Sequence, residues 1–112
     1  MAREATPKVV KIYEDADGNS PFADWLEGLR DVMGRKRILS RIRRLEQGNY
    51  GDCQPVGDGV SKLRLFFGPG YRVYFGEENN DFVILLNGGG KDSQQQDIEA
   101  AKGYWKEYKD NA

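Results

Sequence analysis

The stretch GVSKLRLFFGPGYRVYFGEENNDFVILLNGGGK, residues 59–91, predicts three consecutive strands. Residues 60–67 and 71–75 alternate between apolar and polar side chains, which is the pattern of strands with one buried face. A Gly-Pro-Gly sequence between them favours a tight reversal of the chain. The next run, 81–86, is apolar on both faces and is typical of an interior strand. The stretch therefore predicts an antiparallel meander.

The same alternation assigns cationic side chains to one face of the predicted sheet. Lys62 and Arg64 lie on the polar side of one strand, and Arg72 and Tyr74 on the polar side of the next. We expect the cations of these neighbouring strands to lie together. Like charges side by side cost stability, so a polyanionic partner is a plausible reason for keeping them. Lys91 follows the triple glycine 88–90 and is expected nearby.

The segments outside this stretch predict one strand and three helices. Residues 8–13 form a β-branched run that favours a strand, and Ser20 and Pro21 favour the start of a helix. Residues 30–34 break or kink the helical pattern, which then continues to about residue 47. Residues 49–59 are rich in turn-forming residues and are expected to be a loop. The final helix is expected to begin near Ser93.

These elements predict an α+β fold in a single domain, residues 1–112. The order is strand, helix, helix, strand, strand, strand, helix. We expect a mainly antiparallel four-stranded sheet with the two N-terminal helices and the C-terminal helix packed on one side of it.

Composition limits the kind of chemistry that the chain can perform. The 112 residues carry a net charge of −1 and contain no histidine, which removes the usual general base near neutral pH and the commonest metal ligand. No cluster has metal-ligand spacing, so we expect no metal and no small-molecule cofactor. The single cysteine, Cys53, has no histidine partner and fits a reducing cytoplasm. No membrane-spanning run or signal peptide is predicted, and we expect a cytoplasmic location.

One segment is strongly basic although the whole chain is not. The segment 35–45 contains six cations and no acid, and these cations are candidates for contacts with RNA. A solvated helix face explains them as well. They are Arg35, Lys36, Arg37, Arg41, Arg43 and Arg44.

The sequence resembles the RelE/ParE superfamily of bacterial toxins over nearly its whole length. The motifs that carry the resemblance are KLRLFFGPGYRVYF and LLNGGGKDSQQQDIEAA, with support from PFADWLEGL and RILSRIRRLEQGNYGD. The similarity is strongest to the HigB-like addiction-module killer proteins. The resemblance implies a RelE-like fold and a type II toxin that is held inactive by a cognate antitoxin.

The resemblance also implies an activity and a set of site residues. RelE-like toxins enter the ribosome and cut mRNA without a metal, by attack of a ribose 2′-hydroxyl on the adjacent phosphate. The family's basic positions fall on Lys62, Arg64, Arg72 and Lys91. Arg64 and Arg72 are the main candidates for phosphate binding and transition-state stabilisation. Tyr74 and Asp92 are weaker candidates for proton transfer.

Several of these roles have simpler alternatives. Lys62 is a candidate proton acceptor if Arg64 and Arg72 lower its pKa, but an ordinary RNA-holding charge is slightly favoured. Tyr74 could stack on a base or pack across strands, and Lys91 could hold phosphate or be a loop cation. The triple glycine could allow a close approach of RNA or form a turn with unusual dihedral angles.

Two other functions fit the same fold. A ParE-like toxin would inhibit DNA gyrase through a protein-binding surface and would not be a nuclease. A catalytically silent module would mainly bind its antitoxin. The nuclease interpretation requires Lys62, Arg64 and Arg72 to converge on one exposed surface, and buried internal ion pairs of Arg64 and Arg72 would contradict it.

Overall fold

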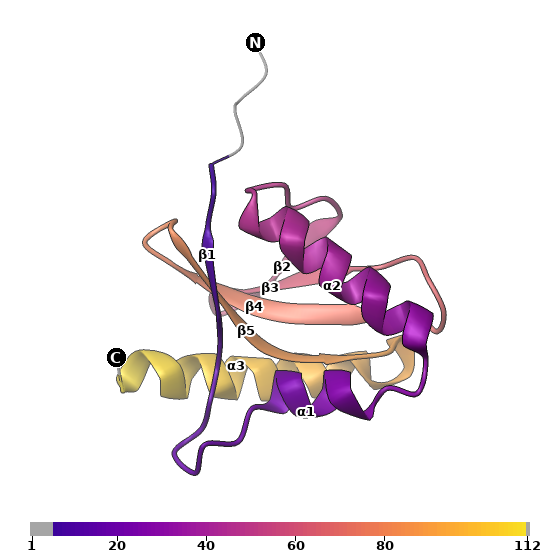
Figure 1. The fold of residues 1–112 in the computed structure, drawn as a ribbon. Coiled ribbons are helices and arrows are strands. Elements are labelled where there is room, and N and C mark those ends of the chain that lie inside the picture. The colour runs from indigo at the N-terminus through magenta and orange to yellow at the C-terminus, as the bar shows by residue number, and fades with distance from the viewer. Residues whose placement is uncertain (1–5, 112) are drawn as a thin grey trace.

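The computed structural model describes residues 6–111, which form a five-stranded mixed sheet with helices on both of its faces (Figure 1). The strand order is β1-β5-β4-β3-β2, with β1 parallel to β5 and the other neighbours antiparallel. The α+β class is therefore confirmed. The elements in chain order are β1 (Val9–Ile12), α1 (Pro21–Gly28), α2 (Val32–Glu46), β2 (Cys53–Gly57), β3 (Val60–Arg64), β4 (Arg72–Glu78), β5 (Phe82–Gly89), the short 3-10 helix η1 (Lys91–Ser93) and α3 (Gln94–Asp110).

The predicted four-stranded sheet is wrong by one strand, because part of the expected loop 49–59 forms β2. This segment pairs antiparallel with β3 and places Cys53 opposite Leu63. The hairpin turns at Asp58 and Gly59, which have φ angles of 55° and 84°. Pro55 is tolerated because β2 lies at the edge of the sheet. A turn-rich composition thus concealed a short edge strand.

Side-chain caps set the starts of the two N-terminal helices. The Ser20 hydroxyl accepts a hydrogen bond from the Ala23 backbone N–H at 3.2 Å, with Pro21 in the first turn of α1. The Asp31 carboxylate accepts one from the Gly34 N–H at 2.9 Å at the start of α2. The interruption predicted at residues 30–34 is therefore a complete break between two helices.

The helices cover opposite faces of the sheet, which corrects the expectation that all of them lie on one side (Figure 1). On one face, Phe22 of α1 and Ile38 of α2 pack with Leu63, Val73 and other buried residues of the sheet. On the other face, Ala101 and Trp105 of α3 pack with a second cluster: Tyr13, Val60, Tyr74, Ile84 and Leu86. The face that the alternation assigned to the cations is therefore the face that α3 covers in part.

The described part of the chain also bears on the expected absence of a membrane segment. Within residues 6–111, no helix combines the length and the apolarity that crossing a membrane requires.

Candidate functional site

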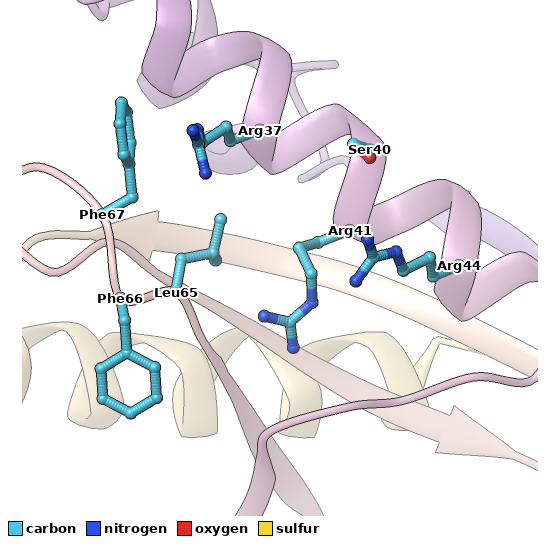
Figure 2. Close-up of a pocket in the computed structure, with 7 residues that line it drawn as sticks. All are labelled: Arg37, Ser40, Arg41, Arg44, Leu65, Phe66 and Phe67. Carbon is cyan, nitrogen blue, oxygen red and sulfur yellow. The ribbon is translucent and has the colours of Figure 1, made fainter.

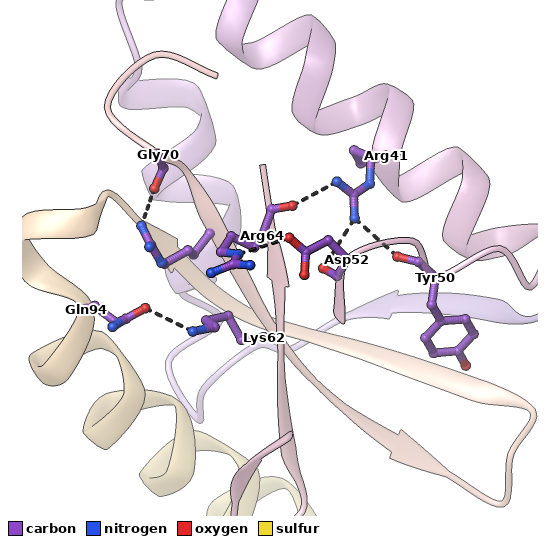
Figure 3. Close-up of polar contacts among 8 residues, drawn as sticks. Arg41, Tyr50, Asp52, Lys62, Arg64, Gly70 and Gln94 are labelled. Atoms are coloured by element: carbon purple, nitrogen blue, oxygen red, sulfur yellow. Dashed lines mark hydrogen bonds and ion pairs between the residues drawn. The ribbon is translucent and has the colours of Figure 1, made fainter. Parts of the chain in front are cut away.

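Three of the predicted site cations lie side by side on β3 and β4. The register places Arg64 opposite Arg72 and Lys62 opposite Tyr74. The expectation that the cations of these two strands meet on one face is confirmed. Their convergence follows from the two-residue period of each strand and from the reversal at residues 68–70. Figure 3 shows Lys62 and Arg64 on the sheet, with Lys62 directed towards the start of α3.

Helix α3 contributes a polar contact to this group. The Lys62 ammonium donates a hydrogen bond to the Gln94 side-chain oxygen at 3.2 Å, and Gln94 is the first residue of α3 (Figure 3). Burial lowers the pKa of Lys62, and the charges of Arg72 and Arg64 lower it further. The site therefore favours the neutral amine of Lys62 more than a solvent-exposed position would.

Arg72 is buried without an acidic partner among the described residues. Its side chain is 7% exposed, and one guanidinium nitrogen donates to the Gly70 backbone oxygen at 2.5 Å. Its Nε atom has no hydrogen-bond partner within the described chain. Buried polar atoms normally have partners, and a buried cation without a counter-charge is costly. An anion such as phosphate, bound beside the guanidinium, would supply the missing counter-charge.

Arg64 has an acidic partner but remains accessible. Its Nε donates to the Asp52 carboxylate at 2.9 Å, and the two side chains are 32% and 27% exposed (Figure 3). This ion pair is only partly buried. A phosphate-binding role would be contradicted if both Arg64 and Arg72 were held in buried ion pairs, and this is not the case. Screening by solvent weakens such partly exposed pairs, so an incoming phosphate can compete with Asp52.

Tyr74 lies in the core and has no exposed ring face on which a base could stack. Its side chain is fully buried beside α3, and its hydroxyl has no hydrogen-bond partner in the described chain. Burial raises the pKa of Tyr74 to about 12, with a further contribution from the charge of Asp97. The packing alternative therefore describes its ring, and the stacking alternative is wrong.

The segment after β5 places Lys91 and Asp92 at the surface beside the Gly-Pro-Gly turn. The Lys91 backbone N–H donates to the Pro69 oxygen at 3.3 Å, and both side chains are exposed. The two residues line a hollow together with Pro69, Gly90, Ser93, Gln95 and Gln96. The expectation that Lys91 lies near the strand cations is confirmed, since the same turn accepts the hydrogen bond from Arg72.

The triple glycine has a structural role that neither sequence interpretation anticipated. A Cβ atom on Gly88 would lie 2.3 Å from the Trp25 ring. A Cβ atom on Gly89 would meet the Asp97 carboxylate. The glycines of this run lack positive φ angles, so unusual dihedral angles do not explain them. These glycines allow an indole and a carboxylate to lie directly on β5.

The basic segment 35–44 divides into one structural arginine and several exposed cations. The Arg41 guanidinium donates to the backbone oxygens of Arg64, Tyr50 and Asp52 at 2.8, 3.1 and 3.5 Å (Figure 3). It thereby ties α2 to the end of β3 and to the segment before β2. Of the others, Arg35 is half-buried and the rest are exposed: Lys36, Arg37, Arg43 and Arg44.

Sequence reasoning missed three polar residues of this region. Asp52 pairs with Arg64, Gln94 contacts Lys62, and Asn87 is buried opposite Tyr74 with its amide donating to the Asp97 backbone oxygen at 3.1 Å. Asn87 carried a usable signal, because it ends an otherwise apolar run. Asp52 and Gln94 lie in ordinary polar sequence contexts that carry no such signal.

Across residues 6–111, no group of three acidic, cysteine or histidine side chains is placed to hold a metal ion.

Comparison with known proteins shows one relative. An "Uncharacterized protein" of Haemophilus influenzae is 46% identical over 81 residues, which are 72% of this chain and 82% of that protein. This chain belongs to the family of that Haemophilus protein. No family model matches the chain. The name of the Haemophilus relative states no activity.

Proposed function

We propose that the protein is a type II toxin of the RelE/HigB-like kind, a metal-independent and ribosome-dependent endoribonuclease of the bacterial cytoplasm. A cognate antitoxin would hold it inactive. The observation that carries the proposal is the juxtaposition of Lys62, Arg64 and Arg72, with Arg72 lacking an acidic partner within the described chain. Such a group suits the extra negative charge of a phosphate under nucleophilic attack.

The proposed reaction uses these side chains in distinct roles. The neutral amine of Lys62 takes the proton of the ribose 2′-hydroxyl, and the 2′-oxygen bonds to the adjacent phosphorus. The bond from phosphorus to the 5′-oxygen breaks, and the leaving oxygen takes up a proton from solvent water. Arg72 and Arg64 stabilise the charge that develops on the phosphate oxygens. The products are a 2′,3′-cyclic phosphate and a 5′-hydroxyl end.

The α+β architecture supports this proposal. Apart from the additional edge strand β2, the helices and strands follow the chain order that the sequence predicted. The proposed site lies at the ends of β3 and β4 beside α3. Exposed cations of α2 would contact ribosomal RNA.

Induction of the full chain alone in a bacterium tests the proposed activity. We expect growth arrest and new mRNA 5′ ends that appear during translation and disappear when initiation is blocked. Growth arrest with intact mRNA and failed supercoiling would instead indicate a gyrase inhibitor. Absence of arrest would indicate a silent antitoxin-binding module.

Substitution of Arg72 tests the site itself. Because Arg72 is buried, Arg72→Met preserves more of its packing than Arg72→Ala. We expect Arg72→Met to lower ribosome-dependent cleavage by about 10²- to 10³-fold, the usual effect of losing one transition-state donor. Arg30→Met is the matched control, because Arg30 is exposed and lies outside the site. A folded Arg72→Met protein with full toxicity would show that Arg72 does not take part in catalysis.

A further inference from the structure

An exposed phenylalanine lies next to the proposed site. Phe66 follows β3 and is 81% exposed, whereas the neighbouring Leu65 is buried. Single exposed apolar residues are common and need no explanation by themselves. The surroundings of Phe66 are unusual, because arginines lie on both sides of the short segment that carries it.

Phe66 and Phe67 point to opposite sides of the chain (Figure 2). Each ring contacts an arginine. The Arg64 guanidinium lies 4.7 Å from the centre of the Phe66 ring. The Arg37 guanidinium lies 4.3 Å from the centre of the Phe67 ring. This aromatic–arginine patch, defined as Phe66, Phe67, Arg37, Arg44 and Arg64, therefore joins the site cations to α2.

Helix α2 lines a hollow against this segment with three arginines. Arg37, Arg41 and Arg44 follow the spacing i, i+4, i+7 and lie along one side of the helix (Figure 2). Arg41 is engaged by backbone oxygens, but Arg37 and Arg44 are exposed and make no ion pair within residues 6–111. The remaining lining residues are Ser40, Leu65, Phe66 and Phe67, so none of the described lining residues is acidic. The hollow is thus lined by cations, and Phe66 at its margin also contacts Arg64.

We propose that the aromatic–arginine patch is a subsite for single-stranded RNA, in which a base stacks on Phe66 and the adjoining phosphates contact Arg37 and Arg44. Accessible aromatic rings combined with cations are the usual means of holding an unpaired strand. An acidic protein segment would engage the arginines but would leave the accessible ring of Phe66 without a stacking partner. Arg64 is shared with the proposed catalytic group, so the subsite would hold nucleotides next to the cleaved phosphate. The assignment to mRNA rests on the proposed function.

Binding of a fluorescein-labelled decauridylate, measured by anisotropy without ribosomes, tests the subsite in the full chain. The proposed nuclease is idle under these conditions, so binding is measured apart from cleavage. We expect Phe66→Ala to weaken binding by about 5- to 150-fold, the range for loss of one stacked base. Phe66→Trp restores a ring and is expected to retain the affinity. Val9→Ala is the matched control, because Val9 is 52% exposed on the opposite edge strand β1.

Salt dependence tests the phosphate contacts. We expect Arg44→Gln to reduce the slope of log affinity against log salt concentration by about 0.7, the value for one phosphate contact to a single strand. Equal affinities of the wild-type and Phe66→Ala proteins would overturn the proposal. Competition by polyglutamate as strong as that by unlabelled RNA would assign the patch to an acidic protein. Tighter binding of decathymidylate than of decauridylate would overturn the assignment to RNA.

The two proposals fail in different ways. Phe66-dependent RNA binding without ribosome-dependent cleavage would refute the proposed function but support the RNA subsite. Ribosome-dependent cleavage that is unchanged in Phe66→Ala, together with unchanged RNA affinity, would overturn the subsite alone.

Discussion

Lys62 lies where its charge is disfavoured, and this bears on both stability and chemistry. Burial and the charges of Arg72 and Arg64 lower its pKa from the ordinary value of 10.5. Between the lowered folded-state pKa and 10.5, the unfolded chain holds more protons than the folded chain, so the free energy of unfolding rises with pH in that window. At neutral pH the positive charge of Lys62 therefore lowers the free energy of unfolding. A residue kept at such a cost is a candidate for function.

Two substitutions of Lys62 test its positive charge and its ability to accept a proton separately. Lys62→Met is expected to raise the melting temperature at pH 7, because it removes a disfavoured charge.

Lys62→Arg keeps a cation that cannot be deprotonated, and we expect it to retain RNA binding but to lower cleavage by about 10²- to 10⁴-fold. The wild-type cleavage rate should rise with pH above 7 towards the lowered pKa. Full cleavage by Lys62→Arg would mean that Lys62 only holds RNA. Lys106→Met, at an exposed position of α3 outside the site, controls for the loss of one positive charge.

At the scale of elements, Asp31 connects the start of α2 to the strand that carries Arg72. One carboxylate oxygen accepts the Gly34 N–H, and the other accepts the Tyr71 hydroxyl at 2.9 Å. The Gly34 hydrogen bond lowers the pKa of Asp31, and the Tyr71 hydroxyl lowers it further. The stabilising contribution is therefore present above the ordinary pKa of 3.8 and is lost as the pH falls through the lowered folded-state value.

Thermal melts of Asp31 variants test this connection. We expect Asp31→Ala to lower the melting temperature at pH 7, and Asp31→Asn to lower it less because asparagine still caps a helix. Below pH 4 the difference between wild type and Asp31→Asn should shrink, since the wild-type carboxylate becomes protonated. Identical melting temperatures for wild type and Asp31→Ala at pH 7 would contradict the capping role.

At the scale of the whole molecule, two strand glycines allow a tryptophan to lie against each face of the sheet. Gly76 of β4 lies under Trp105 of α3, and Gly88 of β5 lies under Trp25 of α1. An added Cβ would approach the indoles to 2.5 and 2.3 Å, which is far inside van der Waals contact. The position of α3 on the sheet, and with it the contact between Gln94 and Lys62, therefore depends on Gly76.

Gly76→Ala is expected to destabilise the protein by about 1–3 kcal/mol, as overpacking of a close-packed core does. The control is Gly103→Ala in α3, where an added Cβ has no neighbour within 4 Å. Gly103→Ala should stabilise the helix by about 0.5–1 kcal/mol. Denaturant unfolding measures both changes, and equal effects of the two substitutions would refute the packing argument.

Local patterns in the sequence were sufficient for much of the fold. Apolar alternation predicted β3 and β4, the apolar run predicted β5, and Ser20 with Pro21 predicted the start of α1. β2 could not be predicted, because a short edge strand containing Pro55 and Gly57 has the composition of a loop. The side of the sheet on which α3 lies was also not predicted. The sequence of an amphipathic helix does not indicate which face of the sheet the helix will cover.

The sequence by itself determined that Lys62, Arg64 and Arg72 share a face, because a strand's side chains alternate with a period of two in any context. Only the tertiary structure decided what lies against that face. Docking of α3 buried Tyr74 and brought Gln94 to Lys62, whereas Arg72 is buried beside the turn at Gly70. Arg64 and Phe66 remain accessible. Burial arises from packing between segments distant in the chain, and it determines which of the aligned cations remain accessible.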